Sequence, residues 1–194
     1  MPYLLYLALV AASALFSALL PQHAAADAQV SLRNQLEFGK RTADSGNKFI
    51  AALGLRGDVT WGRARPNQFR IGPAVEFRTA NFQSLEAAIG PCVLVPTGGG
   101  TTFGLYPMIG AATVKHAPDG AVGIGTLTWG FRSYAYDDAW YGYGLNVFAS
   151  YRRHIGDELA YEITGGVEVD MMFTTFIPLA AIGNFFSSKD PHED

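Results

Sequence analysis

The sequence predicts an all-β fold, an up-and-down antiparallel transmembrane β-barrel of eight strands. Segments in which apolar and polar residues alternate with the period of a β-strand recur eight times along the chain. In these segments one row of side chains carries no charge, whereas the opposite row combines Arg with carboxylates. Glycine accounts for 22 of 194 residues, aromatic residues for 13% and charged residues for only 16%, a composition typical of β-barrels.

The first residues of the chain have a different character. Residues 3–20 are almost wholly apolar and uncharged, and Ala24-Ala25-Ala26 and Ala26-Asp27-Ala28 both fit the small-x-small pattern of a signal-peptide cleavage site. We therefore expect residues 1–28 to be a cleaved signal peptide and the chain to be exported. The alternative is an uncleaved membrane helix, because about 18 apolar residues nearly span a bilayer.

Residues 29–173 form the predicted barrel domain, and its first half contains four strands. In the first strand, Leu32 and Phe38 alternate with Arg33 and Glu37, so opposite faces meet different surroundings. The next three repeat this pattern, with turn-forming Gly, Pro and Asn between them. The four predicted strands cover residues 29–38, 49–61, 68–79 and 83–95.

Four further strands are predicted in the second half of the domain. Asp119-Gly120 is a strong hairpin signal, and Gly156-Asp157 marks another turn. The last strand alternates most regularly, with its apolar row on every odd-numbered residue from Tyr161 to Phe173. These predicted strands cover residues 102–114, 122–136, 140–153 and 161–173.

Proline and the C-terminal residues interrupt the pattern. Pro73, Pro91 and Pro107 fall inside predicted strands, where each removes a backbone donor, so we expect bulges or strand ends there. Residues 174–194 follow the last strand. They predict a short helix with Pro178 in its first turn, and then a polar tail.

The choice of residues indicates which face of the barrel is inside. All four Lys lie outside the predicted strands, whereas Arg occupies the charged rows. The planar guanidinium of Arg can donate two hydrogen bonds to one carboxylate, which suits a buried ion pair. Cations on a lipid-facing wall cost about 2–4 kcal/mol at mid-membrane, and the apolar rows hold none. We therefore expect an interior charge network of six Arg and seven carboxylates: Arg33, Glu37, Arg56, Asp58, Arg70, Glu76, Arg78, Glu86, Arg132, Arg152, Glu162, Glu168 and Asp170.

The opposite arrangement describes a soluble barrel. In that alternative the chain is a lipocalin-like carrier of apolar ligands, and its cavity is lined by Trp61, Phe69, Trp129 and Phe131.

The signal segment, the eight alternating strands and a last strand with Gly165, Val169, Met171 and Phe173 resemble the small outer-membrane β-barrels of Gram-negative bacteria, the OmpA/OmpX type. The resemblance implies location in the bacterial outer membrane, contact with its lipid, and insertion by the barrel-assembly machinery. With an even number of strands, both chain ends face the periplasm. The outer loops are then short: residues 39–48, 80–82, 115–121 and 154–158.

Catalytic residues are not expected. A lipid-modifying rim enzyme, similar to lipid A deacylases or acyltransferases, would draw on Ser150, His154, Asp157, Glu158 and Glu162. Four strand residues separate Ser150 from His154 by about 13 Å, too far for a base to activate a hydroxyl. We thus expect a monomer with no catalytic, cofactor-binding or metal-binding residues. A net charge of −3 argues against a nucleic-acid partner. The expected role is structural, or permeation of small ions or solutes.

Overall fold

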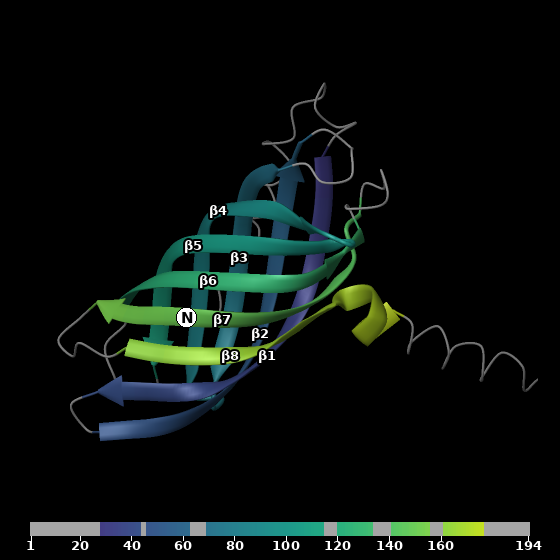
Figure 1. Cartoon of the computed structure of the whole chain (residues 1–194). Coiled ribbons are helices and arrows are strands. Elements are labelled where there is room, and N and C mark those ends of the chain that lie inside the picture. Colours follow the sequence, from purple (N-terminus) through teal and green to yellow (C-terminus); the bar gives the residue numbers. More distant parts are fainter. Residues whose placement is uncertain are drawn as a thin grey trace, which may run out of the picture.

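The computed structural model describes residues 28–43, 46–62, 69–114, 120–133, 141–155 and 161–176. In this part of the chain eight strands pair antiparallel in sequence order, and β8 pairs with β1 to close the barrel (Figure 1). The predicted eight-stranded antiparallel barrel is confirmed. The strands are β1 (Ala28–Ala43), β2 (Gly46–Trp61), β3 (Arg70–Ala80), β4 (Ser84–Gly98), β5 (Thr101–Val114), β6 (Gly120–Arg132), β7 (Gly144–Ile155) and β8 (Tyr161–Asp170).

The strand alternation places the charged rows inside the barrel and the apolar rows outside. Phe69 and Trp129 are 55% and 53% exposed, whereas the soluble-carrier alternative requires both in a central cavity. That alternative is therefore wrong about these side chains. The outward row continues around the wall with large apolar residues that are all at least 38% exposed, among them Leu36, Leu53, Ile71, Ile89, Leu105, Ile109, Leu127, Leu145, Val147, Ile163 and Val167.

The hairpin between β1 and β2 is longer than predicted. Residues 39–48 were expected to form a loop, but pairing continues to Ala43↔Gly46, so Lys40 and Lys48 lie in strands. The β2 residues before Ala52 have no partner on β3, because β3 ends at Ala80. The two strands extend because each supplies the other's ladder hydrogen bonds beyond the barrel.

The three prolines lie within continuous strands and not at strand ends. Pro73 is the register partner of Pro91 across β3 and β4. Pro91 and Pro107 face each other in a short stretch where β4 and β5 lack paired residues, while the register on both sides is unchanged. The expected bulges or strand ends are therefore wrong, since only the ladder is interrupted. Inward-facing Gly90 lets the strands approach here, because an added Cβ would lie 2.1 Å from the Pro107 carbonyl oxygen.

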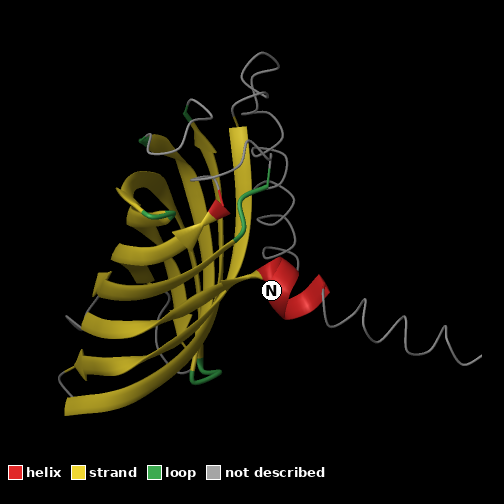
Figure 2. Cartoon of the chain, turned by 45° about the vertical axis from the view of Figure 1, so that its right-hand side comes forward, coloured by secondary structure: helices red, strands yellow, loops and turns green. Residues whose placement is uncertain are grey.

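The last strand ends earlier than predicted. β8 stops at Asp170, whose carboxylate accepts a hydrogen bond from the Met172 backbone N–H at 2.7 Å and turns the chain into a short helix, η2 (Met172–Phe176) (Figure 2). Phe173 therefore lies in η2 and packs edge-on against Tyr143, with ring centroids 6.0 Å apart. On the outer wall, Asn34 of β1 donates a hydrogen bond to Thr174 at 2.5 Å.

Tyr141 and Gly142, just before β7, lie beside the part of β1 that β8 does not reach. β6 ends at Arg132 and β7 begins at Gly144, so both strands are shorter than predicted. Between them, Gly142 donates its backbone N–H to the Val30 carbonyl at 2.7 Å, and Tyr141 forms a parallel bridge with Val30. These contacts supply partners for the part of β1 that extends past the end of β8.

Several predictions lie outside the described residues. They include the signal peptide before Ala28, the helix and tail after residue 176, and the candidate residues Asp157 and Glu158. Among the helical residues that the structure describes, none belongs to a helix long and apolar enough to cross a membrane.

Candidate functional site: an ion-pair chain inside the barrel

All thirteen charged residues predicted to face inward are buried, each no more than 4% exposed. They come from seven of the eight strands, and β5 contributes none of them. Because an unpaired charge in such surroundings is very costly, the pairing of each group determines whether this interior is stable.

At the end of the barrel where β1 begins and β8 ends, the pairs centre on Asp58. Its carboxylate forms an ion pair with Arg33 and another with Arg132, whose Nη2 lies 2.9 Å from Oδ1. Ser31 donates a hydrogen bond to the same Oδ1 at 3.0 Å. The Tyr106 hydroxyl lies between these groups, accepting from Arg132 at 2.9 Å and from Arg33 at 3.2 Å.

The middle of the barrel is organised by Arg56. Its guanidinium pairs with Glu76 at 2.6 Å and with Glu168 at 2.9 Å. The Tyr106 ring centroid is 4.6 Å from its Cζ and the Phe148 centroid 5.6 Å, so the cation also contacts two aromatic faces. Two carboxylates and two aromatic rings therefore stabilise the buried Arg56 cation together.

Nearer the end of the barrel at which β1 and β2 form their hairpin, which we call the hairpin end, two Arg and two Glu form a closed ring. Arg78 pairs with Glu37 at 3.1 Å and with Glu86 at 2.8 Å. Arg152 contacts the same two carboxylates at 3.4 and 3.2 Å, and it also pairs with Glu76 of the middle layer. Four strands, β1, β3, β4 and β7, are therefore held together across the interior by one set of contacts.

The last group of pairs lies at the mouth of the barrel. Glu162 pairs with Arg78 at 2.9 Å, with Arg41, and with His154 Nε2 at 3.2 Å. The Arg41 side chain is 24% exposed, whereas Glu162 is fully buried. Arg41 and His154 therefore separate the buried carboxylate from the outside.

Together these contacts form one continuous series of alternating charges, which we call the ion-pair chain. It contains six Arg and six carboxylates and runs in the order Arg132, Asp58, Arg33, Glu168, Arg56, Glu76, Arg152, the Glu37 and Glu86 pair, Arg78, Glu162 and Arg41. Each carboxylate lies between cations, so the interior is close to neutral at every level.

Two predicted members have other contacts. Arg70 donates to the Thr60 backbone carbonyl at 3.3 Å. Asp170 accepts hydrogen bonds from the Tyr141 hydroxyl at 3.0 Å and from the Met172 backbone, so it ends β8 and is not among the ion pairs described. Sequence reasoning missed Tyr106 and Arg41. Both lie on the inward row of their strands, and that position was the available indication.

Part of the interior is lined by uncharged residues, and we call this part the apolar wall. It is a single cluster of buried residues on β3 to β6: Ala74, Ala88, Cys92, Leu94, Tyr106, Met108, Ala112, Val122 and Ile124. Tyr106 belongs to both regions, since its ring packs in the wall while its hydroxyl contacts the ion-pair chain.

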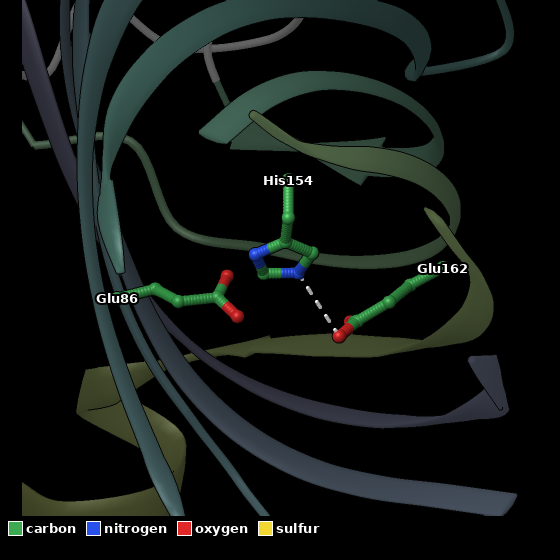
Figure 3. A group of neighbouring side chains, drawn as sticks. All are labelled: Glu86, His154 and Glu162. Carbon is green, nitrogen blue, oxygen red and sulfur yellow. Dashed lines mark hydrogen bonds and ion pairs between the residues drawn. The ribbon is translucent and has the colours of Figure 1, made fainter. Parts of the chain in front are cut away.

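The structure also brings together three possible metal ligands that the sequence did not indicate. Glu86, His154 and Glu162 come from β4, β7 and β8, and their ligand atoms all lie within 4.8 Å of one another (Figure 3). However, Glu86 is paired with Arg78 and Arg152, and Glu162 with Arg41 and Arg78. A divalent cation would have to displace these guanidiniums and then lie beside them, so the arrangement does not fit a metal site.

The candidate catalytic residues are not arranged as a nucleophile and base. Ser150 shares a hydrogen bond with Thr126 at 3.0 Å, while His154 interacts with Glu162. A hydrolase needs the base within hydrogen-bond reach of the hydroxyl.

Comparison with known proteins gives one similar structure. No family model matches the chain, and no curated protein matches it. Among solved structures, Neisserial surface protein A (NspA) is similar with a TM-score of 0.44 and 12% sequence identity, over 73% of this chain and 97% of that one.

Proposed function

We propose that this chain is a non-catalytic outer-membrane barrel whose role is structural, with an interior closed by ion pairs. Two observations of the structure support the proposal. The outer wall exposes a belt of large apolar side chains, and the charges on the inward rows are buried within the barrel. A closed barrel with such a belt satisfies its backbone in lipid without an exposed edge.

The ion-pair chain carries the second part of the proposal. It extends from Arg132 at one end of the barrel to Arg41 at the other, and its side chains are buried throughout except at Arg41. An eight-stranded barrel is just wide enough for its side chains to fill it. Paired Arg and Glu that contact each other across the lumen leave a solid plug, which favours a structural role over passage of solutes.

Permeation of small ions is the alternative within the same class. It requires the pairs to separate, which costs several kcal/mol per buried charge. The rim-enzyme alternative has less support, because neither Ser150 nor any other described hydroxyl forms a hydrogen bond with His154.

As for partners, we expect a monomer that contacts outer-membrane lipid and is inserted by the assembly machinery.

The test has two steps. The full chain is expressed in a Gram-negative host, and outer membranes are compared on a gel with and without boiling. A band that resides in the membrane and changes mobility on boiling supports the closed barrel, whereas soluble protein without a shift refutes the membrane location.

The second step measures conductance of the purified protein in planar bilayers. A closed plug predicts no stable conductance at neutral pH. Steady single-channel currents would instead support permeation and overturn the structural role. Arg78→Met provides the contrast, because it breaks the ring with Glu37 and Glu86 and should produce leak currents if the ion pairs close the barrel.

A further inference from the structure

We propose that the outer wall around β8, at the hairpin end, binds the phosphorylated glycolipid of the outer leaflet, with its phosphates on Lys40 and Arg153. The inference rests on the proposed membrane location. The relevant surface, which we call the basic rim, consists of Lys40 on β1, Tyr161 and Ile163 on β8, and Tyr151 and Arg153 on β7.

Strand alternation directs both cations outward. Lys40 follows Phe38 on the outward row of β1, and Arg153 follows Tyr151 on that of β7; all four are exposed. The prediction that the apolar rows hold no cation is therefore wrong at these two positions, which lie near the ends of their strands. Lys40 is the register partner of Ile163, and Arg153 of Tyr161, so the cations lie on either side of β8. Two strand spacings and a two-residue offset put their Cα atoms about 12 Å apart.

These cations differ from the Arg of the interior in having no counterion among the described residues. Each Arg of the ion-pair chain contacts at least one carboxylate, but no described carboxylate lies within ion-pair distance of Lys40 or Arg153. A cation that faces a membrane interface without a protein partner is favoured when anionic lipid supplies the charge. The partner chemistry is therefore an anionic headgroup.

The surface beside Arg153 also provides space for an acyl chain. Its register partner on β6 is Gly123, and the partner of Tyr151 is Gly125. A Cβ added at either glycine would meet nothing within 4 Å, so this outward strip is open. It runs from the level of Arg153 toward Leu127, which is 45% exposed, and so descends from the charge into the apolar belt.

Aromatic rings indicate where the basic rim lies relative to the lipid headgroups. Tyr151 and Tyr161 stack with ring centroids 6.2 Å apart, and Phe38 and Phe49 stack at 6.3 Å. Such rings prefer the level of the headgroups. Lys40 is the register partner of Phe49, and Arg153 that of Tyr161, so both cations lie at this level. Two such cations, with an open strip beside one of them, fit a disaccharide that bears a phosphate at each end and several acyl chains. A phospholipid has one phosphate and would engage only one of the cations.

The test measures binding of purified diphosphoryl lipid A to the folded barrel in detergent, by native mass spectrometry over a lipid titration. Lys40→Ala and Arg153→Ala should each weaken binding roughly fivefold, and the double variant about 25-fold, since a cation near an anionic surface contributes about this factor. Lys40→Arg and Arg153→Lys should bind as the parent does. Gly123→Leu should weaken binding while retaining both charges, because it fills the open strip.

Lys48→Ala is the matched control. Lys48 is an exposed cation of the same hairpin, but it lies on the inward row with Ile50, so its removal should leave binding unchanged. Unchanged lipid A binding by the double variant would overturn the proposal. Equally tight binding of phosphatidylglycerol by the parent would also overturn it, in favour of general phospholipid contact. A heat-modifiable barrel with either result keeps the proposed function intact, whereas a protein that never enters the membrane refutes that function itself.

Discussion

The two regions of the barrel interior, the ion-pair chain and the apolar wall, are both buried but are stabilised in opposite ways. The ion-pair chain consists of desolvated charges that must each find a partner, whereas the apolar wall packs residues such as Leu94, Met108 and Ile124 without any such requirement. Removing a partner from a charged pair strands a buried charge, while trimming an apolar residue leaves a cavity. Burial alone therefore does not predict how a substitution acts; the chemistry of the neighbours decides.

The largest effect on stability is expected from Arg78→Met in the ion-pair chain. This change leaves Glu37, Glu86 and Glu162 without one cation each, and we expect the free energy of unfolding to fall by about 3–5 kcal/mol. Urea titration in lipid vesicles, followed by tryptophan fluorescence, measures it. Arg41→Met is the control, with a loss of about 1 kcal/mol or less because Arg41 is partly exposed and Glu162 keeps Arg78. Equal losses would show that the pairs do not act as a desolvated chain.

On the apolar wall, Leu94→Ala should cost about 3 kcal/mol, the sum of lost burial and a residual cavity. The same urea titration gives the value. The neighbouring Val95 faces outward and is 41% exposed, so Val95→Ala should cost about 1 kcal/mol. If the two variants were equally stable, the wall would not be a packed core.

Tyr106→Phe tests the contact between the ion-pair chain and the apolar wall. It keeps the ring in the wall but removes the hydroxyl that accepts from Arg132 and Arg33, so we expect a loss of about 1–3 kcal/mol. Combined with Arg132→Met, the two effects should be less than additive, because the second change removes a donor that the first left unpaired. Full additivity would show that the Tyr106 hydroxyl does not interact with Arg132 and that Tyr106 belongs only to the apolar wall. Tyr151→Phe on the outer wall is the neutral control.

The smallest effect concerns Tyr141 in the connection between β6 and β7, outside the strands. Burial, and then the nearby Asp170 carboxylate, raise the pKa of Tyr141 to about 12. In the unfolded chain the pKa is about 10, so the unfolded state releases the proton first. The stability that neutral Tyr141 contributes is therefore complete below about pH 10 and is lost as the pH rises toward 12. Urea midpoints between these pH values should fall less in Tyr141→Phe than in the parent; identical slopes would contradict the assignment.

The sequence indicated much of the fold because the strand period is a local property. Alternation placed Arg33, Glu76 and Glu168 on inward rows, and the absence of Lys from the charged rows of the predicted strands indicated which rows were inside. Errors concentrated where long-range contacts decide. The β1–β2 hairpin extends because its strands pair with each other, and β8 stops at Asp170 because that carboxylate caps η2.

What the sequence determined by itself is the number of strands, their inward and outward rows, and the charge-rich interior, since each follows from residue type and period. Only the tertiary structure decided which Arg contacts which carboxylate, because pairs such as Arg33 with Glu168 join strands far apart in the chain. It also decided that buried apolar residues of β3 to β6 gather into the apolar wall beside those charges. The physical reason is closure: register between β8 and β1 sets which side chains meet, and no local pattern encodes that register.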